Sequence, residues 1–147
     1  MKWFYNSIME IEDKINYWIE ISEYDLETAN AMLQTKRFLY VGFMCHQAIE
    51  KILKGYYVSI HEATPPYSHN LSVLSEESGI YSDYTETQKD FIDMLSPLNV
   101  KTRYPTYKKS ITNTLDEKKS KSILIKTKEL HQWIKMKLLK KLKDTQV

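Results

Sequence analysis

The sequence predicts an all-α protein, an antiparallel, up-and-down bundle of four to five helices. Apolar residues recur at three- and four-residue steps along several long segments, which is the period of an amphipathic helix. Strand signals are absent, because neither a sustained period of two nor an Asn-Gly or Asp-Gly hairpin turn occurs. With 3 Gly and 4 Pro among 147 residues, 42% of them hydrophobic, the chain is neither disordered nor collagen-like and has the length of one domain.

The first helix has one stripe of residues expected to face the core. Its start is open, because Ser7 and Glu10 form a capping-box pattern and Asp13 offers a second starting point. We therefore treat residues 1–13 as an N-terminal extension or helix start, 14–142 as the bundle and 143–147 as a tail. The stripe consists of Ile15, Trp18, Ile19, Ser22, Leu26, Ala29, Met32 and Leu33.

The second helix, from about Phe38 to Ile60, is apolar on most of its sides, so it is expected to lie at the centre of the bundle. Gly42 and Gly55 each cost such a helix about 1 kcal/mol relative to Ala. Their presence predicts that neighbouring backbones approach closely at both positions.

Proline and capping residues divide the rest of the chain. Pro65 and Pro66 end the second helix, and Ser68 reads as the cap of a short helix that ends near Gly79. A capping box at Thr85 and Gln88 opens a further helix, which stops before Pro97.

A long loop is expected over residues 97–113, and loops of this length in compact domains are often functional. Thr114 to Glu117 then caps the final helix. The apolar side of that helix carries Ile123, Leu130, Trp133, Ile134 and Leu138.

Charge is distributed unevenly. The balance is −5 over residues 1–30, −3 over 31–100 and +10 over 101–147. The basic third can attract phosphate groups or an acidic partner, or it can simply be a solvated, Lys-rich helix face. Cys45 stands alone, which excludes a disulfide framework and predicts a small core residue. No apolar run approaches the roughly 20 residues of a membrane span and the first residues do not form a signal peptide, so we expect a cytoplasmic protein without a membrane partner.

Five polar side chains interrupt the most hydrophobic segment: His46, Gln47, Glu50, Lys51 and Lys54. Buried polar groups need partners, and Asp25 on the acidic first helix is a candidate for Lys51 or Lys54. The cluster is either an inter-helix network that fixes the register of the bundle or a polar groove that receives a ligand. His46 and Glu50 share a helix face, but this spacing alone is too weak to predict a metal site.

These residues carry a resemblance to a known family. His46-Gln-Ala-Ile-Glu-Lys51 with Lys54, Ser-His69-Asn-Leu71, and Arg103-Tyr104-Pro105, together with Trp18, Asp25 and Leu26, are similar to the HEPN domain (higher eukaryotes and prokaryotes nucleotide-binding). The resemblance spans about residues 14–140. It implies a compact helical bundle, usually a homodimer, like the domains that accompany minimal nucleotidyltransferases. Other members are ribonucleases of toxin–antitoxin and defence systems.

The sequence departs from the ribonuclease members, which have an Arg followed after four to six residues by a His. After Arg103 the matching places hold Lys108, Lys109, Ser110 and Ile111, and the next histidine is His131. Without that imidazole no general base for RNA cleavage is evident, so we predict no catalytic residue and no cofactor. The chain also lacks the Gly-Ser and paired aspartates of a polymerase-β-type nucleotidyltransferase.

The leading hypothesis is a non-catalytic, dimeric module that binds a nucleotide or an RNA phosphate and works with a separate nucleotidyltransferase chain. Arg103 is the expected anion anchor, because its planar fork binds phosphate oxygens in a bidentate way. The other candidate ligand contacts are Tyr104, Lys51, Lys54, His69, His46 and Gln47, and the residues expected to be structural are Asp25, Glu50 and Trp18.

Three alternatives stay open. The protein can be a HEPN ribonuclease toxin with a degenerate motif. It can also be a purely structural protein–protein interaction module. Arg103 and Tyr104 can instead anchor a loop, with the arginine capping a helix C-terminus and the tyrosine packing as a lid.

Overall fold

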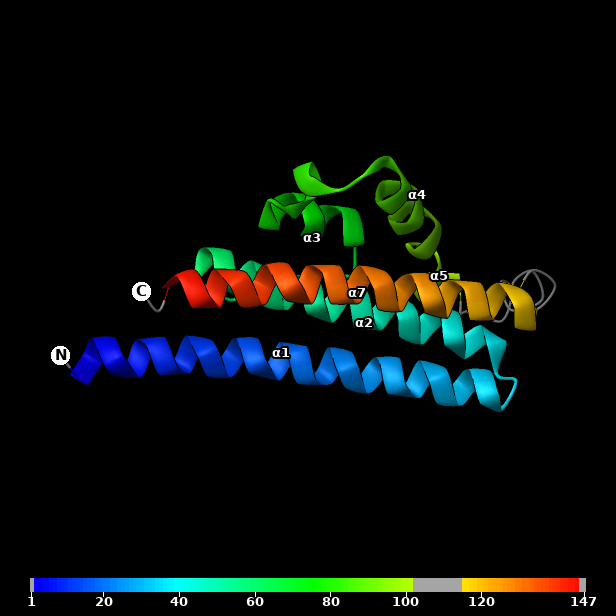
Figure 1. Ribbon diagram of the computed structural model, residues 1–147, viewed down its shortest axis with the longest axis horizontal. Coiled ribbons are helices and arrows are strands. Elements are labelled where there is room, and N and C mark those ends of the chain that lie inside the picture. The colour runs from blue at the N-terminus through cyan, green and yellow to red at the C-terminus, as the bar shows by residue number, and fades with distance from the viewer. Residues whose placement is uncertain (1, 102–114, 146–147) are drawn as a thin grey trace.

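The computed structural model describes residues 2–101 and 115–145, and the regular secondary structure in this part of the chain is all helical, as predicted. Three long helices lie side by side, with four short ones packed over one side (Figure 1). The long helices are α1 (Lys2–Gln34), α2 (Phe38–His61) and α7 (Glu117–Thr145). The short elements are α3 (Leu71–Ser78), the 3₁₀ helix η1 (Ile80–Asp83), α4 (Glu86–Leu95) and α5 (Leu98–Lys101).

The α3–α5 segment carries the chain from the end of α2 back toward its beginning, so α7 runs in the same direction as α2 and α1 runs opposite to both (Figure 1). This return gives the bundle its up-and-down path. The two ends of the described chain lie at the same end of the bundle (Figure 1).

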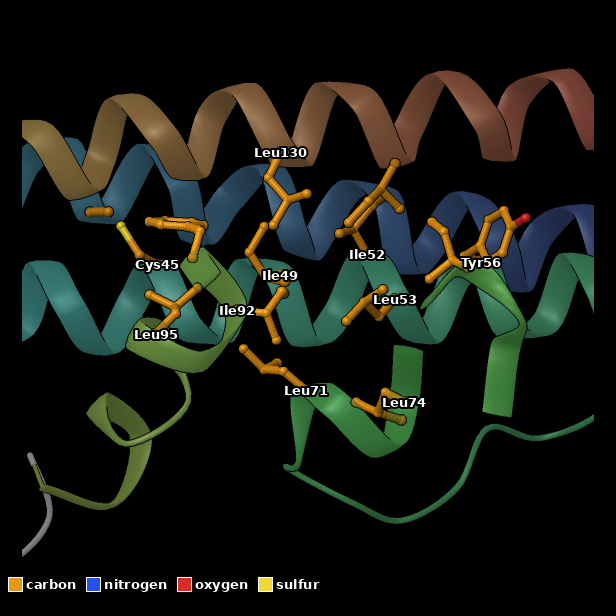
Figure 2. Close-up of a cluster of buried hydrophobic side chains, with 14 of the residues drawn as sticks. Cys45, Ile49, Ile52, Leu53, Tyr56, Leu71, Leu74, Ile92, Leu95 and Leu130 are labelled. Carbon is orange, nitrogen blue, oxygen red and sulfur yellow. The ribbon is translucent and has the colours of Figure 1, made fainter. Parts of the chain in front are cut away.

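Helix α2 is the centre of the molecule, as its composition predicts, and it contacts α1, α3, α4, α5 and α7. Figure 2 shows its buried side chains between Leu130 of α7 on one side and residues of α3 and α4 on the other. Those on α2 are Cys45, Ile49, Ile52, Leu53 and Tyr56, and those on α3 and α4 are Leu71, Leu74, Ile92 and Leu95.

The two glycines of α2 lie at close helix contacts, but the nearest atoms at both belong to side chains rather than to the neighbouring backbones that the sequence predicted. A Cβ atom at Gly55 would be 3.0 Å from the Trp18 Cβ and 3.3 Å from Cδ1 of Leu138. At Gly42 it would be 3.0 Å from Cδ1 of Leu98. A side chain at Gly55 would therefore separate α2 from α1 and α7, whereas at Gly42 the flexible end of Leu98 would have to move.

Several helix ends differ from the prediction. Helix α1 begins at Lys2, before both expected starts. The cap of α3 is Asn70 rather than Ser68, because the Asn70 side chain accepts hydrogen bonds from the Ser72 and Val73 amides. The capping box of Thr85 and Gln88 and the left-handed C-cap at Gly79 (φ 85°) are both present.

The last helix begins at the predicted cap. Asp116 caps α7 by accepting a hydrogen bond from the Lys119 amide. The helix then continues to Thr145, past residue 142.

The expected loop over residues 97–113 begins as a helix instead. Helix α5 forms there because Leu98 packs on Gly42 of α2 and the Asn99 side chain accepts a hydrogen bond from Gln47. Residues 102–114, and with them Arg103, Tyr104 and Pro105, lie outside the described residues.

Candidate functional site

The polar side chains of α2 lie where three other parts of the chain meet that helix. Helix α1 brings Asp25 and Trp18, the segment before α3 brings His69, and α5 brings Asn99. Each contributes at least one contact to a polar residue of α2. The cluster therefore joins four elements rather than lining a single surface.

Asp25 and Lys51 form the best-defined ion pair of the cluster. Their Oδ2 and Nζ atoms are 2.5 Å apart, with the carboxylate buried and the lysine partly exposed. A buried carboxylate is stable only when a cation or hydrogen-bond donors compensate its desolvation. Lys51 thus supplies the charge that allows Asp25 to sit between α1 and α2.

Glu50 is the centre of a second group. Its side chain is 4% exposed, and its oxygens lie 3.0 Å from Nδ1 of His69 and 3.4 Å from Nζ of Lys54. Nδ1 of His46, a fully buried residue, is 3.9 Å away. Because an ionised carboxylate only accepts hydrogen bonds, His69 donates through Nδ1. A neutral His69 ring then carries its lone pair on Nε2, in a side chain that stays 46% exposed.

Trp18 closes this group on the α1 side. Nζ of Lys54 lies 5.8 Å from the centre of the Trp18 ring, within the range of a cation–π contact. The same tryptophan packs against Gly55. Lys54 is therefore held between a carboxylate and an aromatic face.

Gln47 connects α2 to α5. Its Nε2 donates a 2.8 Å hydrogen bond to Oδ1 of Asn99. Sequence reasoning did not select Asn99, because a lone Asn after a Pro-Leu pair has no motif that marks it. The contact fixes the start of the segment that continues toward Arg103 and Tyr104, which themselves lie outside the described residues.

The structure thus brings together every predicted site residue that it describes. These residues are His46, Gln47, Glu50, Lys51, Lys54, His69, Asp25 and Trp18. Both lysines already have carboxylate partners, so the cluster has little surplus positive charge to offer an anion. The printed contacts of the cluster link α2 to α1, to the segment before α3 and to α5.

A second polar contact, between α1 and α7, was not predicted from the sequence. His131 is buried and its Nε2 lies 2.8 Å from the Ser22 hydroxyl, which itself donates to the Ile19 carbonyl. Because the one hydroxyl proton is used, Nε2 of His131 must donate. Burial lowers the pKa of His131 to about 4, while nearby Glu23 opposes the shift and Lys135 adds to it. The ring is neutral at pH 7 and is almost completely buried.

Cys45 has the character predicted for it. It is fully buried, and burial raises the pKa of its thiol to about 11 although a hydrogen bond with Thr127 acts in the opposite direction. Such a thiol is not a nucleophile at neutral pH.

Two absences hold for the described part of the chain. Within residues 2–101 and 115–145, no group of three or more His, Cys, Asp or Glu side chains could hold a metal ion. None of the helices in the same ranges is long and apolar enough to cross a membrane.

Comparisons with known proteins agree with the resemblance. A family model described as the HEPN domain matches residues 15–138. A crystal structure of TT1696 from Thermus thermophilus is similar in fold, with a TM-score of 0.72. At 18% identity, the match covers 84% of this chain and 98% of that one. No curated protein matches the sequence.

Proposed function

This chain belongs to the HEPN domain family, and from that premise we propose that it is a non-catalytic module that binds a nucleotide or an RNA phosphate as a homodimer. It acts in the cytoplasm beside a separate minimal nucleotidyltransferase chain, in a setting like that of a toxin–antitoxin pair. Arg103 is the anion anchor and Tyr104 stacks on a base. Lys51, Lys54 and His69 contribute from α2 and the segment before α3.

The hydrogen bond between Gln47 and Asn99 is the observation that carries this proposal. It fixes α5 beside the turn of α2 that also bears Glu50 and Lys51, and Arg103 follows Asn99 by only four residues in the sequence. A guanidinium supplied there would add the cation that the paired lysines do not. The polar side chains of α2 and Arg103 would then serve one ligand.

The non-catalytic part of the proposal rests on the histidines. Arg103 lacks the following histidine of the ribonuclease motif, and His131 is neutral and sealed between α1 and α7. His46 is fully buried. His69 donates to Glu50 and keeps Nε2 exposed, but it precedes Arg103 in the chain and so is not the histidine of that motif. We expect the purified protein to degrade RNA no faster than an Arg103→Ala control. Cleavage that this substitution abolishes would instead support the ribonuclease alternative.

Dimerisation is common among HEPN domains. The chain has 11 Tyr and 3 Trp, and Tyr40 and Tyr67 are exposed large aromatic residues in the described part. Aromatic residues are enriched at interfaces between proteins. Light scattering at tens of micromolar should give twice the 17.5 kDa mass of one chain, and a particle of 17.5 kDa would contradict the proposed dimer.

Calorimetry with ATP, GTP and a dinucleotide tests the site. We expect Arg103→Ala to weaken binding by about 1.5–3 kcal/mol, the size of a charged hydrogen bond. Lys108→Ala, a lysine in the same segment, is the matched control and should bind like wild type. Equal losses in the two variants would point to general charge rather than to an anchor, and unchanged binding in Arg103→Ala would reject the site.

Lys51 needs a different design because its removal leaves Asp25 buried without a cation. The double variant Asp25→Asn, Lys51→Gln removes both charges and keeps a hydrogen bond across the helices. If Lys51 contacts the ligand, this variant should also bind more weakly, and adding Arg103→Ala should cost less than the sum of the two losses. Unchanged binding in a stable double variant would leave the α2 cluster a purely structural network.

A further inference from the structure

A groove at one end of the bundle adjoins the α2 cluster through Trp18 but contains none of the charged residues of that cluster. Its walls come from α1, the end of α2 and the segment that follows α2, and its volume is about 400 Å³. That volume is in the range of ligand-binding clefts in proteins. The residues that line it are Glu10, Asp13, Lys14, Tyr17, Trp18, Val58, Ala63, Thr64 and Pro65.

The lining of the groove is aromatic and apolar. Tyr17 and Trp18 form an edge-to-face pair with ring centres 5.7 Å apart, and Val58 and Pro65 belong to the same lining. Tyr17 remains 57% exposed although it belongs to this pair. Rings arranged in this way offer faces that attract a cation.

The polar lining residues make the groove acidic. Glu10 forms a 3.2 Å ion pair with Lys14, whereas Asp13 has no ion-pair partner among the residues whose side chains the structure describes. Because Glu10 and Lys14 offset each other, Asp13 leaves the lining with one uncompensated negative charge. A phosphate would be repelled here, and a cation would be attracted.

We propose that this groove binds a basic peptide segment of a partner protein, with an arginine or lysine side chain laid on Tyr17 and Trp18 and its charge beside Asp13. Long cationic side chains have an apolar stem and a charged end, which match the aromatic lining and the unpaired carboxylate respectively. The negative charge of Asp13 favours a cationic side chain over an anionic or neutral one. The proposal does not rest on nucleotide binding, because the groove shares only Trp18 with the α2 cluster and attracts the opposite charge.

The conformation of the segment after α2 supports a preformed wall. Helix α2 ends at His61, and Glu62 adopts a left-handed conformation (φ 50°, ψ 36°) while its amide bonds to the Val58 carbonyl. The chain then turns directly into Ala63, Thr64 and Pro65, which line the groove. Because proline fixes its own φ angle, this wall needs little ordering when a peptide binds.

Titration of the ¹⁵N-labelled protein with the peptide acetyl-Arg-Leu-Arg-amide tests the proposal, read by the indole N–H signal of Trp18. That signal is assigned with a Trp18→Phe variant. We expect it to shift with the basic peptide and to stay in place with acetyl-Glu-Leu-Glu-amide or acetyl-Gln-Leu-Gln-amide. Asp13→Asn should raise the dissociation constant about threefold and Tyr17→Ala about fivefold, which correspond to exposed ion-pair and cation–π contacts.

Helix α1 offers matched controls outside the groove. Glu27→Gln removes another exposed acid and Tyr24→Ala another exposed tyrosine, 69% exposed, and both should bind the basic peptide like wild type. Equal weakening in these controls, or equal shifts with the acidic or neutral peptide, would overturn the proposal. A Trp18 shift that follows protein concentration without peptide would assign the groove to a second copy of the chain and would also overturn it.

Discussion

Two polar regions of this bundle hold their buried groups in different ways. On one side of α2, carboxylates and cations face one another, as in the pairs of Asp25 with Lys51 and of Glu50 with Lys54. At the contact of α1 with α7, the buried pair is His131 with the hydroxyl of Ser22. In the described part of the chain no carboxylate forms a hydrogen bond with that imidazole, and burial lowers its pKa to about 4.

The difference shows what a buried titratable group requires. A charge survives burial when an opposite charge touches it, and a group without such contact gives up its charge instead. The charged region, made of Asp25, Lys51, Glu50, Lys54 and His69, joins α2 to α1 and to the segment before α3. The neutral region, made of His131 and Ser22, joins only α1 and α7. The two regions should therefore respond differently to substitution and to pH.

The largest effect is expected at Glu50. Glu50→Ala removes the acceptor of His69 and leaves Lys54, itself largely buried, without its carboxylate. Breaking one side of a buried ion pair typically costs several kcal/mol, and we expect the free energy of unfolding in urea to fall by about 3 kcal/mol.

Glu50→Gln is the matched control, because it keeps an oxygen acceptor for His69 and the volume of the side chain. It should lose clearly less stability than the alanine variant. If Glu50→Ala cost less than about 1 kcal/mol, the charged region would not be what organises the contact of α2 with its neighbours.

Titration of His131 in the neutral region should make the free energy of unfolding depend on pH. An unfolded chain titrates His131 at its ordinary pKa of 6.5, and the folded chain at about 4. Between these values the unfolded state binds a proton that the folded state does not, so stability falls as the pH is lowered through this window. From pH 7 to pH 5 we expect this residue to contribute a loss of about 2 kcal/mol.

Urea unfolding of wild type and His131→Gln across this range isolates that contribution. Glutamine can still donate to Ser22 but has no proton to gain, so its loss between pH 7 and pH 5 should be smaller by about 2 kcal/mol. Parallel pH profiles of the two proteins would show that the imidazole is not held neutral by the fold. Carboxylates titrate in both proteins alike and cancel in the difference.

Much of the fold follows from local signals. The period of the apolar residues predicts α1, α2 and α7, and the capping box of Thr85 and Gln88 marks the start of α4. Helix α5 was missed because its stability comes from contacts distant in sequence, namely Leu98 on Gly42 and Asn99 on Gln47. A four-residue helix has too short a pattern to be read from periodicity.

The site shows the same division. The polar residues on an otherwise apolar α2 predicted that their partners would come from other elements. Because a buried charge needs an opposite charge, Asp25 was a predicted partner, and it does pair with Lys51. The contact of His131 with Ser22 was not foreseen, because each residue alone is common in a helix and only the packing of α1 on α7 brings them together. The groove beside Tyr17 likewise depends on the path of the chain after α2.

The two glycines of α2 also differ in how much space surrounds them. Gly55 lies where α1 and α7 both approach α2, and an added Cβ would meet the Cβ of Trp18, which cannot rotate away. Gly42 faces the methyl end of Leu98, which can. Alanine gains about 1 kcal/mol of helix propensity at either position, while overpacking costs about 1–3 kcal/mol.

We therefore expect Gly55→Ala to destabilise the protein by about 1 kcal/mol and Gly42→Ala to be neutral or slightly stabilising. Thermal and urea unfolding of the two variants measure the difference. The reverse order would mean that α5 rather than α1 and α7 confines the central helix.

The smallest effect concerns the segment that brings His69 to Glu50. Asn70 accepts from the amides of Ser72 and Val73, whereas Ser68, the cap expected from the sequence, accepts only from the amide of Asn70. Asn70→Ala should cost about 1 kcal/mol, a typical loss for an N-cap, and Ser68→Ala only a few tenths.

The cap also positions the neighbouring histidine, so the two residues should be coupled. In a His69→Ala background, where the contact with Glu50 is already gone, Asn70→Ala should cost about 0.5 kcal/mol less than in wild type. A double-mutant cycle by urea unfolding measures this. Additive losses would mean that Glu50 holds His69 without help from the helix start, and the charged region would then be organised by α2 alone.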